Sequence, residues 1–239
     1  VDTAHGHSQI VLDTLKAISK LRKKFELIGV NVATADATKA LIDCGAGGIK
    51  VGIGPGSICT TRMIAGVGVP QLTAIIECSE VARKESIPII ADGGIKYSGD
   101  IAKAWAAVAD AIMMGSIFAG TDESPGKKFK VNGKIYKRYR GMGSIGAMSS
   151  GSANRYFQKK FKDKSKFVPE GVEGRVEYKG SVSKIIYQLK GGLRSSMGYL
   201  GSRQIKYLRD KPQFVKITKA GFYESMVHNV DIVKSDNKY

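Results

Sequence analysis

Cysteine is scarce in this sequence: only three occur among 239 residues, and no two of them form a CxxC pair. Cys44, Cys59 and Cys78 are odd in number, so they cannot build an even disulfide framework. This usage favours a reducing, cytoplasmic compartment in which each thiol is either buried or reactive. The 6 Pro and 29 Gly, beside 43% hydrophobic residues, argue against collagen-like, fibrous and disordered proteins.

Long apolar runs are also missing. No stretch approaches the roughly 20 consecutive apolar residues that a membrane helix needs, so no membrane association is expected. Residues 1–5 contain no basic stretch followed by an apolar one, which is the pattern of a secretory signal. The chain does not begin with Met and starts in what reads as the end of a strand, so we expect a fragment.

Acidic residues are few: 21 Asp and Glu stand against 38 Lys and Arg, for a net charge of +17. Clustered lysines could neutralise nucleic-acid phosphates. Much of the excess lies in residues 127–166 and 179–219, but neither an RNP-type aromatic motif nor a zinc-finger spacing accompanies it. We therefore interpret the lysines as a solubilising surface and expect no specific nucleic-acid partner.

Short apolar runs alternate with helical patterns along residues 1–116. Strands are predicted at residues 27–30, 49–53, 87–91 and 111–114, and helices at 9–25, 72–85 and 99–109. Thr34 can cap a further helix, and Gly45 can close it in the left-handed conformation. The strand ends fall at Asp2, Asn31, Gly54, Asp92 and Gly115. Such alternation predicts an α/β fold with a parallel sheet, whose ligands bind at the carboxyl ends of the strands.

The alternation stops at residues 120–180, a polar, basic stretch without a long apolar period. A segment of that length is typical of a lid or a disordered insertion, and we call it the flap. After it, Ser181 is predicted to cap a helix that ends at Gly191-Gly192. The tail from Ser225 onward is predicted to be weakly ordered.

Residues 52–61 (GIGPGSICTT) carry the sharpest chemical signal. Glycines let backbone amides and carbonyls face a ligand, and a cysteine in such a loop is partly exposed near amide dipoles. Cys59 is therefore a candidate covalent nucleophile. A tight turn with an inert buried thiol is an equal alternative. Cys44 at a helix end and Cys78 within a helix are predicted to serve packing.

Two consecutive strands end in Asp92-Gly93-Gly94 and Gly115-Ser116. In barrels the loops after the final two strands often build a phosphate site, and a carboxylate such as Asp92 would then accept from a sugar hydroxyl. Two ordinary turns are the alternative. Asp2, His5 and His7 do not have a standard zinc spacing, so Asp2 is better interpreted as an acceptor for ribose or amide groups.

Together these segments resemble inosine-5′-monophosphate (IMP) dehydrogenase over nearly the whole chain. The resemblance is carried by residues 52–61, 90–94 (IADGG), 113–116 (MMGS), 139–148 (YRGMGSIGAM), Arg155-Tyr156 and 168–171 (VPEG). It implies the C-terminal portion of a (β/α)8 TIM barrel over residues 1–239, with about five of eight strands. The flap and a tail at 220–239 would belong to it. The opening strands and the regulatory cystathionine-β-synthase pair would be absent, leaving apolar faces exposed.

The resemblance implies NAD-dependent oxidation of IMP to XMP in guanine nucleotide biosynthesis. Cys59 would form a thioimidate at C2 of the purine, and the flap would assist its hydrolysis, with Arg155 as general base. The implied catalytic residues are Cys59, Arg155, Tyr156 and Thr61. The implied substrate-binding residues are Ser57, Asp92, Gly94, Gly115, Ser116, Tyr139, Gly141, Met142, Gly143 and Glu170. The implied NAD-binding residues are Asp2, Asn31, Gly52, Gly54 and Thr61.

The resemblance also implies a cytoplasmic homotetramer that binds K⁺. The ion would be held by Gly54, Gly56 and Cys59 of one subunit and by Glu224, Ser225 and Met226 of a neighbour; the family commonly has His at the last position. GMP reductase is the alternative enzyme, although it typically lacks the Arg-Tyr pair and carries a Glu within the segment 145–147. A further alternative is an inactive remnant that binds nucleotide or RNA.

Overall fold

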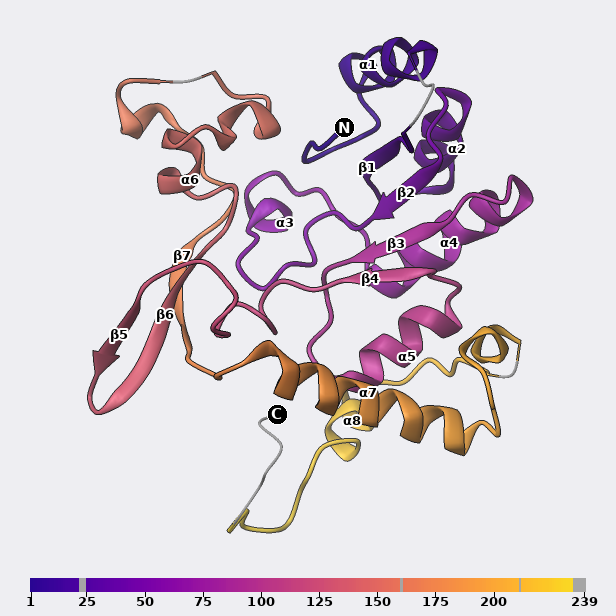
Figure 1. Cartoon of the computed structure of the whole chain (residues 1–239), viewed down its shortest axis with the longest axis vertical. Helices are drawn as coiled ribbons and strands as arrows, with labels where there is room; N and C mark the ends of the chain where they lie inside the picture. Colours follow the sequence, from indigo (N-terminus) through magenta and orange to yellow (C-terminus); the bar gives the residue numbers. More distant parts are fainter. Residues whose placement is uncertain (22–24, 160, 211, 234–239) are drawn as a thin grey trace.

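The computed structural model describes residues 1–21, 25–159, 161–210 and 212–233. Its centre is a four-stranded parallel sheet in the order β1-β2-β3-β4 (Figure 1). The strands are β1 (Ile28–Val32), β2 (Gly48–Val51), β3 (Ile89–Asp92) and β4 (Ala111–Met113). All four residues of β2 are buried, as expected for a parallel strand covered on both faces. The fold is therefore α/β, as the alternation predicted.

Helices connect consecutive strands of this sheet. They are α2 (Ala35–Asp43), α3 (Thr61–Ile64), α4 (Gln71–Lys84) and α5 (Ser98–Ala106). The Thr34 hydroxyl accepts a hydrogen bond from the Ala37 amide, which confirms the predicted cap. Gly45 adopts φ +91°, and a Cβ there would lie 2.7 Å from the Ser19 Cβ. Both the backbone and the packing therefore require glycine at this helix end.

The segment before β1 differs from the prediction. α1 (Gln9–Lys20) buries Val11 and Leu15 and ends at Lys20, whereas a helix to Phe25 was expected; residues 22–24 of that helix lie outside the described ones. No strand ends at Asp2. Instead the Val1 nitrogen donates to the Ile28 carbonyl (3.0 Å) and the Gly6 amide to the Asn31 carbonyl (2.7 Å). The described parallel sheet thus has four strands where about five were expected.

The flap contains more regular structure than its composition indicated. An antiparallel sheet of β5 (Lys128–Val131), β6 (Lys134–Arg140) and β7 (Glu173–Glu177) projects from the molecule (Figure 1). Between β6 and β7 lie α6 (Ile145–Ser149) and two short 3₁₀ helices, η1 (Ser152–Tyr156) and η2 (Lys164–Lys166). A separate small core of Met148, Ala153 and Phe167 supports them. The sheet left no long apolar period in the sequence, because β5 is only four residues long, β6 has basic side chains on both faces, and Val176 is the one apolar side chain of β7.

The chain then returns to the parallel sheet. α7 (Val182–Tyr199) starts at the predicted cap Ser181, but it continues past Gly191-Gly192 to Tyr199. Gly192 packs against α5 so closely that a Cβ would lie 2.0 Å from the Ser98 hydroxyl oxygen. Gly192 therefore serves helix contact, whereas Gly191 has open space around it, and neither glycine ends the helix. η3 (Ile205–Arg209) and α8 (Lys219–Glu224) follow.

The main hydrophobic core lies between the parallel sheet and its helices, with Leu15, Leu41, Ile49, Ile75 and Ile89 almost fully buried. Among the described residues, no helix combines the length and apolarity needed to cross a membrane.

Candidate active site

The loop after β2 carries Cys59 and depends on glycine. Gly52 has φ +146°, and a Cβ there would lie 2.2 Å from the Asp92 carbonyl oxygen. Only glycine lets the two strand ends approach so closely. The loop is also tied to the flap, because the Thr60 amide donates to the Glu170 carbonyl (2.9 Å) and the Val172 amide to the Ile58 carbonyl (3.0 Å). Cys59 is therefore presented between the strand ends and the flap.

The Cys59 thiol is partly exposed and is the first group of a short chain of hydrogen-bonded side chains. Its Sγ lies 3.2 Å from the Thr61 hydroxyl, which donates to a carboxylate oxygen of Glu170 at 2.7 Å. Cys44 and Cys78 are buried, as predicted, and burial raises the pKa of Cys78 to about 11. Of the three thiols, Cys59 alone combines exposure with polar neighbours, which are the conditions for a nucleophile.

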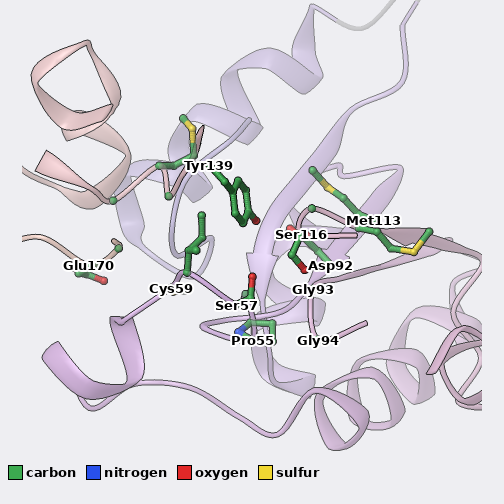
Figure 2. Close-up of a pocket in the computed structure, with 18 of the residues that line it drawn as sticks. Pro55, Ser57, Cys59, Asp92, Gly93, Gly94, Met113, Ser116, Tyr139 and Glu170 are labelled. Atoms are coloured by element: carbon green, nitrogen blue, oxygen red, sulfur yellow. The ribbon is translucent and has the colours of Figure 1, made fainter. Parts of the chain in front are cut away.

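Cys59 lines a cavity of about 460 Å³ at the carboxyl ends of the strands of the parallel sheet (Figure 2). Most of the residues selected from the sequence meet there. Those that line it are Asp2, Gly56, Ser57, Cys59, Asp92, Gly94, Gly115, Ser116, Tyr139, Gly141, Met142, Gly143, Arg155, Tyr156 and Glu170.

The wall opposite Cys59 contains unused backbone donors. Within the described residues, no acceptor takes the amide hydrogens of Gly94, Gly115 or Ser116. The Tyr139 ring points towards Ser116 in Figure 2, and a Cβ on Gly115 would lie 3.1 Å from the Tyr139 hydroxyl. Backbone amides without acceptors, close to a phenol, are donors that an anion could use.

Asp92 at the end of β3 lies in a network that the sequence did not reveal. Its Oδ2 accepts from the Lys50 ammonium (2.5 Å) and from the Asn31 side-chain amide (3.0 Å). The Asn31 amide also donates to the Gly52 carbonyl at 2.8 Å. Asn31, Lys50 and Asp92 lie on three adjacent strands, so strand register brings them together.

A second ion pair joins the flap to the N-terminal segment. The Arg155 guanidinium pairs with the Asp2 carboxylate, and the Ala4 amide donates to the Arg155 carbonyl at 3.0 Å. Burial acts to raise the pKa of Asp2, but Arg155, with Lys50, holds that pKa below its usual value. Burial acts to lower the pKa of Arg155, but Asp2 outweighs it and raises that pKa. Arg155 is therefore firmly protonated while the pair is formed.

Tyr156 lies next to Arg155 and lines the same cavity. Burial raises the pKa of its phenol, although the neighbouring Arg155 opposes that shift. A Cβ on Gly143 would lie 2.9 Å from the Tyr156 ring. Glycine at position 143 thus allows this ring to reach the cavity.

Several predicted residues do not line the cavity. Thr61 and Asn31 each lie one hydrogen bond behind its wall, through Glu170 and Asp92 respectively, and the Gly52 carbonyl accepts from Asn31. Gly54 has φ +76° and packs on the Arg62 side chain. Glu224, Ser225 and Met226 are exposed and take no part in the cavity.

Lys50 and Gln71 were not selected from the sequence. Lys50 lines the cavity, and the Gln71 amide donates to the Val51 (3.0 Å) and Asp92 (3.2 Å) carbonyls. The signal for Lys50 was present, because a lone charge in the apolar run Ile49-Lys50-Val51 needs a buried partner. Gln71 carried no comparable signal, since it stands at the polar start of a helix.

The comparisons with known proteins agree with this geometry. Residues 1–228 match the model of the IMP dehydrogenase / GMP reductase domain. Similar proteins named inosine-5′-monophosphate dehydrogenase include those of Cryptosporidium parvum (60% identical over 239 residues) and Aquifex aeolicus (59% over 240 residues). The Bacillus subtilis protein of that name is 57% identical over 239 residues.

In each of these three comparisons the match covers 100% of this chain. It covers 59% of the Cryptosporidium protein and 48% of each of the two bacterial proteins. The chain thus spans about half the length of the curated relatives it matches. The matched residues and the assembled cavity together place the chain in the IMP dehydrogenase / GMP reductase family.

Proposed function

We propose that this chain is the catalytic portion of an NAD-dependent IMP dehydrogenase, which oxidises IMP to XMP in guanine nucleotide biosynthesis. The observation that carries the proposal is that the partly exposed Cys59 thiol shares one cavity with the Asp92 carboxylate and the free amides of Gly115 and Ser116. A nucleophile, a sugar acceptor and an anion site are the parts that covalent nucleotide chemistry requires.

The nucleotide is oriented by the two ends of the cavity. Its phosphate accepts from the amides of Gly94, Gly115 and Ser116 and from the Tyr139 hydroxyl, and Ser57 adds a further hydroxyl. Asp92 accepts from the ribose hydroxyls. The purine then extends towards Cys59, where Met142, Gly143 and Glu170 surround the base.

The chemistry proceeds in two halves. The Cys59 sulfur bonds to C2 of the purine as the thiol proton is lost, and the C2 hydrogen leaves with its electron pair. NAD⁺ supplies the acceptor of that hydride and is reduced to NADH. Water then adds at C2, the C–S bond breaks, and XMP leaves with the thiol restored. Cys59 therefore divides one difficult oxidation into two easier steps.

Proton transfer from the water has two candidate routes in the cavity. The resemblance assigns the base role to Arg155 with Tyr156, but the Asp2 pair holds Arg155 protonated. The Glu170 carboxylate is the alternative base, because its hydrogen bond with Thr61 connects it to Cys59. We assign proton removal to Glu170 through Thr61 while Arg155 is paired, and to Arg155 when it leaves Asp2.

Asp2 links dinucleotide binding to the flap. It belongs to the implied NAD-binding residues together with Asn31, Gly52 and Gly54, yet in this structure Arg155 of the flap pairs with it. The buried Asn31 Oδ1 has no hydrogen-bond partner among the described residues, which leaves one acceptor unused behind this wall of the cavity. Binding of the flap and binding of the dinucleotide at Asp2 therefore exclude each other. The flap closes over the cavity after NADH leaves and shields the hydrolysis step from bulk water.

A potassium ion fits the Cys59 loop in part. K⁺ prefers rings of carbonyl oxygens, and the carbonyls of Gly54, Gly56 and Cys59 lie on this turn. The Gly56 carbonyl already accepts from the Cys59 amide at 3.1 Å, which leaves it one further lone pair. When bound, the ion would supply a charge that holds the loop carbonyls together. The remaining donors, at Glu224, Ser225 and Met226, would come from a neighbouring copy.

Donors to the ion from a neighbouring copy require an oligomer, which is consistent with the proposed homotetramer. The arrangement of the parallel sheet supports a barrel. β1 to β4 run parallel in chain order with the site at their carboxyl ends, as four consecutive strands of a (β/α)8 barrel do. Strands beyond the edges formed by β1 and β4 would complete the barrel. Ile28 on β1 is 40% exposed, so the β1 edge carries apolar surface for such a neighbour.

GMP reductase is the second candidate, because the matching domain model is shared by both enzymes. Two features favour the dehydrogenase. Arg155 and Tyr156 lie in the cavity, and residues 145–147 are Ile-Gly-Ala without the glutamate typical of the reductase.

The direct test is NADH absorbance after the chain is mixed with IMP, NAD⁺ and K⁺. We expect a rise that is lost in the Cys59→Ala variant and kept in Cys44→Ala, because Cys44 is buried away from the cavity. Oxidation of NADPH with GMP, and no reaction with IMP, would assign the reductase instead. Salt-dependent RNA binding without either reaction would support the inactive remnant.

A further inference from the structure

Lys50 is a charged side chain in the otherwise apolar strand β2, and only 9% of the residue is exposed. Burial of an ammonium is costly unless the charge is paired and hydrogen-bonded. Its partner is Asp92, whose Oδ2 lies 2.5 Å from the Lys50 Nζ. A strand with all four residues buried does not need a lysine for packing, so the ion pair calls for a functional explanation.

The two carboxylate oxygens of Asp92 have different surroundings. Oδ2 receives two donors, Lys50 Nζ and Asn31 Nδ2. No described residue donates to Oδ1, and the Asp92 side chain keeps 23% of its surface exposed at the cavity. The carboxylate is thus anchored through one oxygen and presents the other to a ligand.

The other cations of the cavity do not hold Asp92. Arg155 pairs with Asp2, and the two remaining cations that line the cavity, Lys96 and Arg140, are exposed and make no ion pair with Asp92. Asn31 donates from a neutral amide, so it brings no positive charge to the carboxylate. Lys50 therefore provides the charge that fixes the orientation of Asp92.

We propose that Lys50 is the positioning residue of the ribose site: it holds Asp92 through Oδ2, so that Oδ1 faces the ribose hydroxyls of the nucleotide. This inference rests on the proposed function, because it takes the ligand to be a ribonucleotide with its sugar at Asp92. Lys50 acts through Asp92 and makes no contact with the reacting atoms.

The role separates Lys50 from a residue that only supports the strand. If Lys50 acts through Asp92, its loss reduces affinity only for nucleotides that carry ribose hydroxyls. If it only supports β2, its loss weakens binding with and without hydroxyls alike. The ratio of two affinities measured on one variant distinguishes these cases, since general damage cancels in the ratio.

The experiment titrates the full 239-residue chain with IMP and with 2′,3′-dideoxy-IMP by calorimetry. The wild type should bind IMP roughly ten- to a hundredfold more tightly, as expected for hydrogen bonds to a charged acceptor. In Lys50→Met the preference should fall to within about threefold. Lys50→Arg should restore it because the charge is kept. Lys84→Met, an exposed lysine on α4, removes the same charge and should leave the preference unchanged.

Circular dichroism confirms that each variant is folded, and Lys50→Gln, which keeps a donor, replaces Lys50→Met if that variant unfolds. An unchanged preference in the neutral variant, with both affinities lowered alike, overturns the inference and leaves the proposed function standing. A wild type that binds IMP without preferring it over the dideoxy form also overturns the inference alone. A wild type that binds neither nucleotide removes the proposed function and this inference with it.

Discussion

The Thr61 hydroxyl donates to the Glu170 carboxylate at 2.7 Å, which joins residues that are 109 positions apart in the chain. Thr61 follows the Cys59 loop, whereas Glu170 belongs to the flap. Because Cys59 Sγ also lies 3.2 Å from the Thr61 hydroxyl, the flap carboxylate is connected to the nucleophile by a single side chain.

Replacing Glu170 with Gln should slow hydrolysis of the covalent intermediate more than its formation. Gln keeps the hydrogen bond but cannot accept a proton, and general-base catalysis typically contributes 10²- to 10⁴-fold, so we expect a loss of about a hundredfold. Rapid-mixing absorbance should show an NADH burst of normal rate, followed by a slow steady state. Glu173→Gln, a flap carboxylate outside the Cys59 cavity, is the matched control. Equal slowing of burst and steady state in E170Q would contradict the role.

Arg155→Ala should slow turnover strongly and leave hydride transfer intact, because Arg155 acts only after NADH has left and only the route through Thr61 and Glu170 remains. The expected record is a burst of one NADH per active site, followed by a much slower steady state. Arg138→Ala, on an exposed strand of the flap, removes the same charge and should turn over normally. Loss of both steps, or of neither, would remove the assigned role.

Thiol reactivity should separate the three cysteines. Burial raises the pKa of Cys78 to about 11, so at pH 8 only about one thiol in a thousand would be ionised there. A purine nucleotide alkylator such as 6-chloropurine riboside monophosphate should modify Cys59, and IMP should suppress the reaction. Intact mass with peptide mapping reads both results. Labelling spread over Cys44 and Cys78 and indifferent to IMP would count against the site.

The same thiol predicts a pH dependence of stability. The folded pKa of Cys78 lies above its ordinary value of 9.0, so the neutral form is favoured in the folded state. The resulting contribution, about 2–3 kcal/mol, is present below pH 9 and is lost as pH rises towards 11, because the unfolded chain ionises first. Urea unfolding from pH 8 to 11 should therefore show a steeper decline than in Cys78→Ala. Parallel declines would contradict it.

Gly52→Ala should destabilise the fold and disrupt the Cys59 loop. The added Cβ would lie 2.2 Å from the Asp92 carbonyl oxygen, and φ is +146°, so strain and a steric clash act together. We expect a loss of about 3 kcal/mol in the free energy of unfolding. Gly99→Ala in α5 has no atom within 4 Å of its added Cβ and should be neutral or stabilising by up to about 1 kcal/mol. A Gly52→Ala variant as stable as the wild type would show that the strand ends can separate.

Local sequence signals predicted the elements near the parallel sheet well. Thr34 and Gly45 marked the ends of α2, because a cap and a left-handed turn depend on one residue each. The extent of α7 was wrong at Gly191-Gly192, since glycine also permits close helix packing, and sequence alone does not separate these uses. The flap sheet was missed because β5 alternates over only four residues, β6 carries basic residues on both faces and β7 has a single apolar side chain.

The sequence by itself determined which chemical groups are present. It placed the Cys59 loop, Asp92 and Gly115-Ser116 near strand ends, and the Arg155-Tyr156 pair in the flap. Tertiary structure decided how they are partnered. Three pairs join residues that are more than 40 positions apart in the chain: Lys50 with Asp92, Thr61 with Glu170, and Asp2 with Arg155. Such pairs follow from strand register and from where the flap docks, and these depend on packing across the whole chain, which no local pattern records.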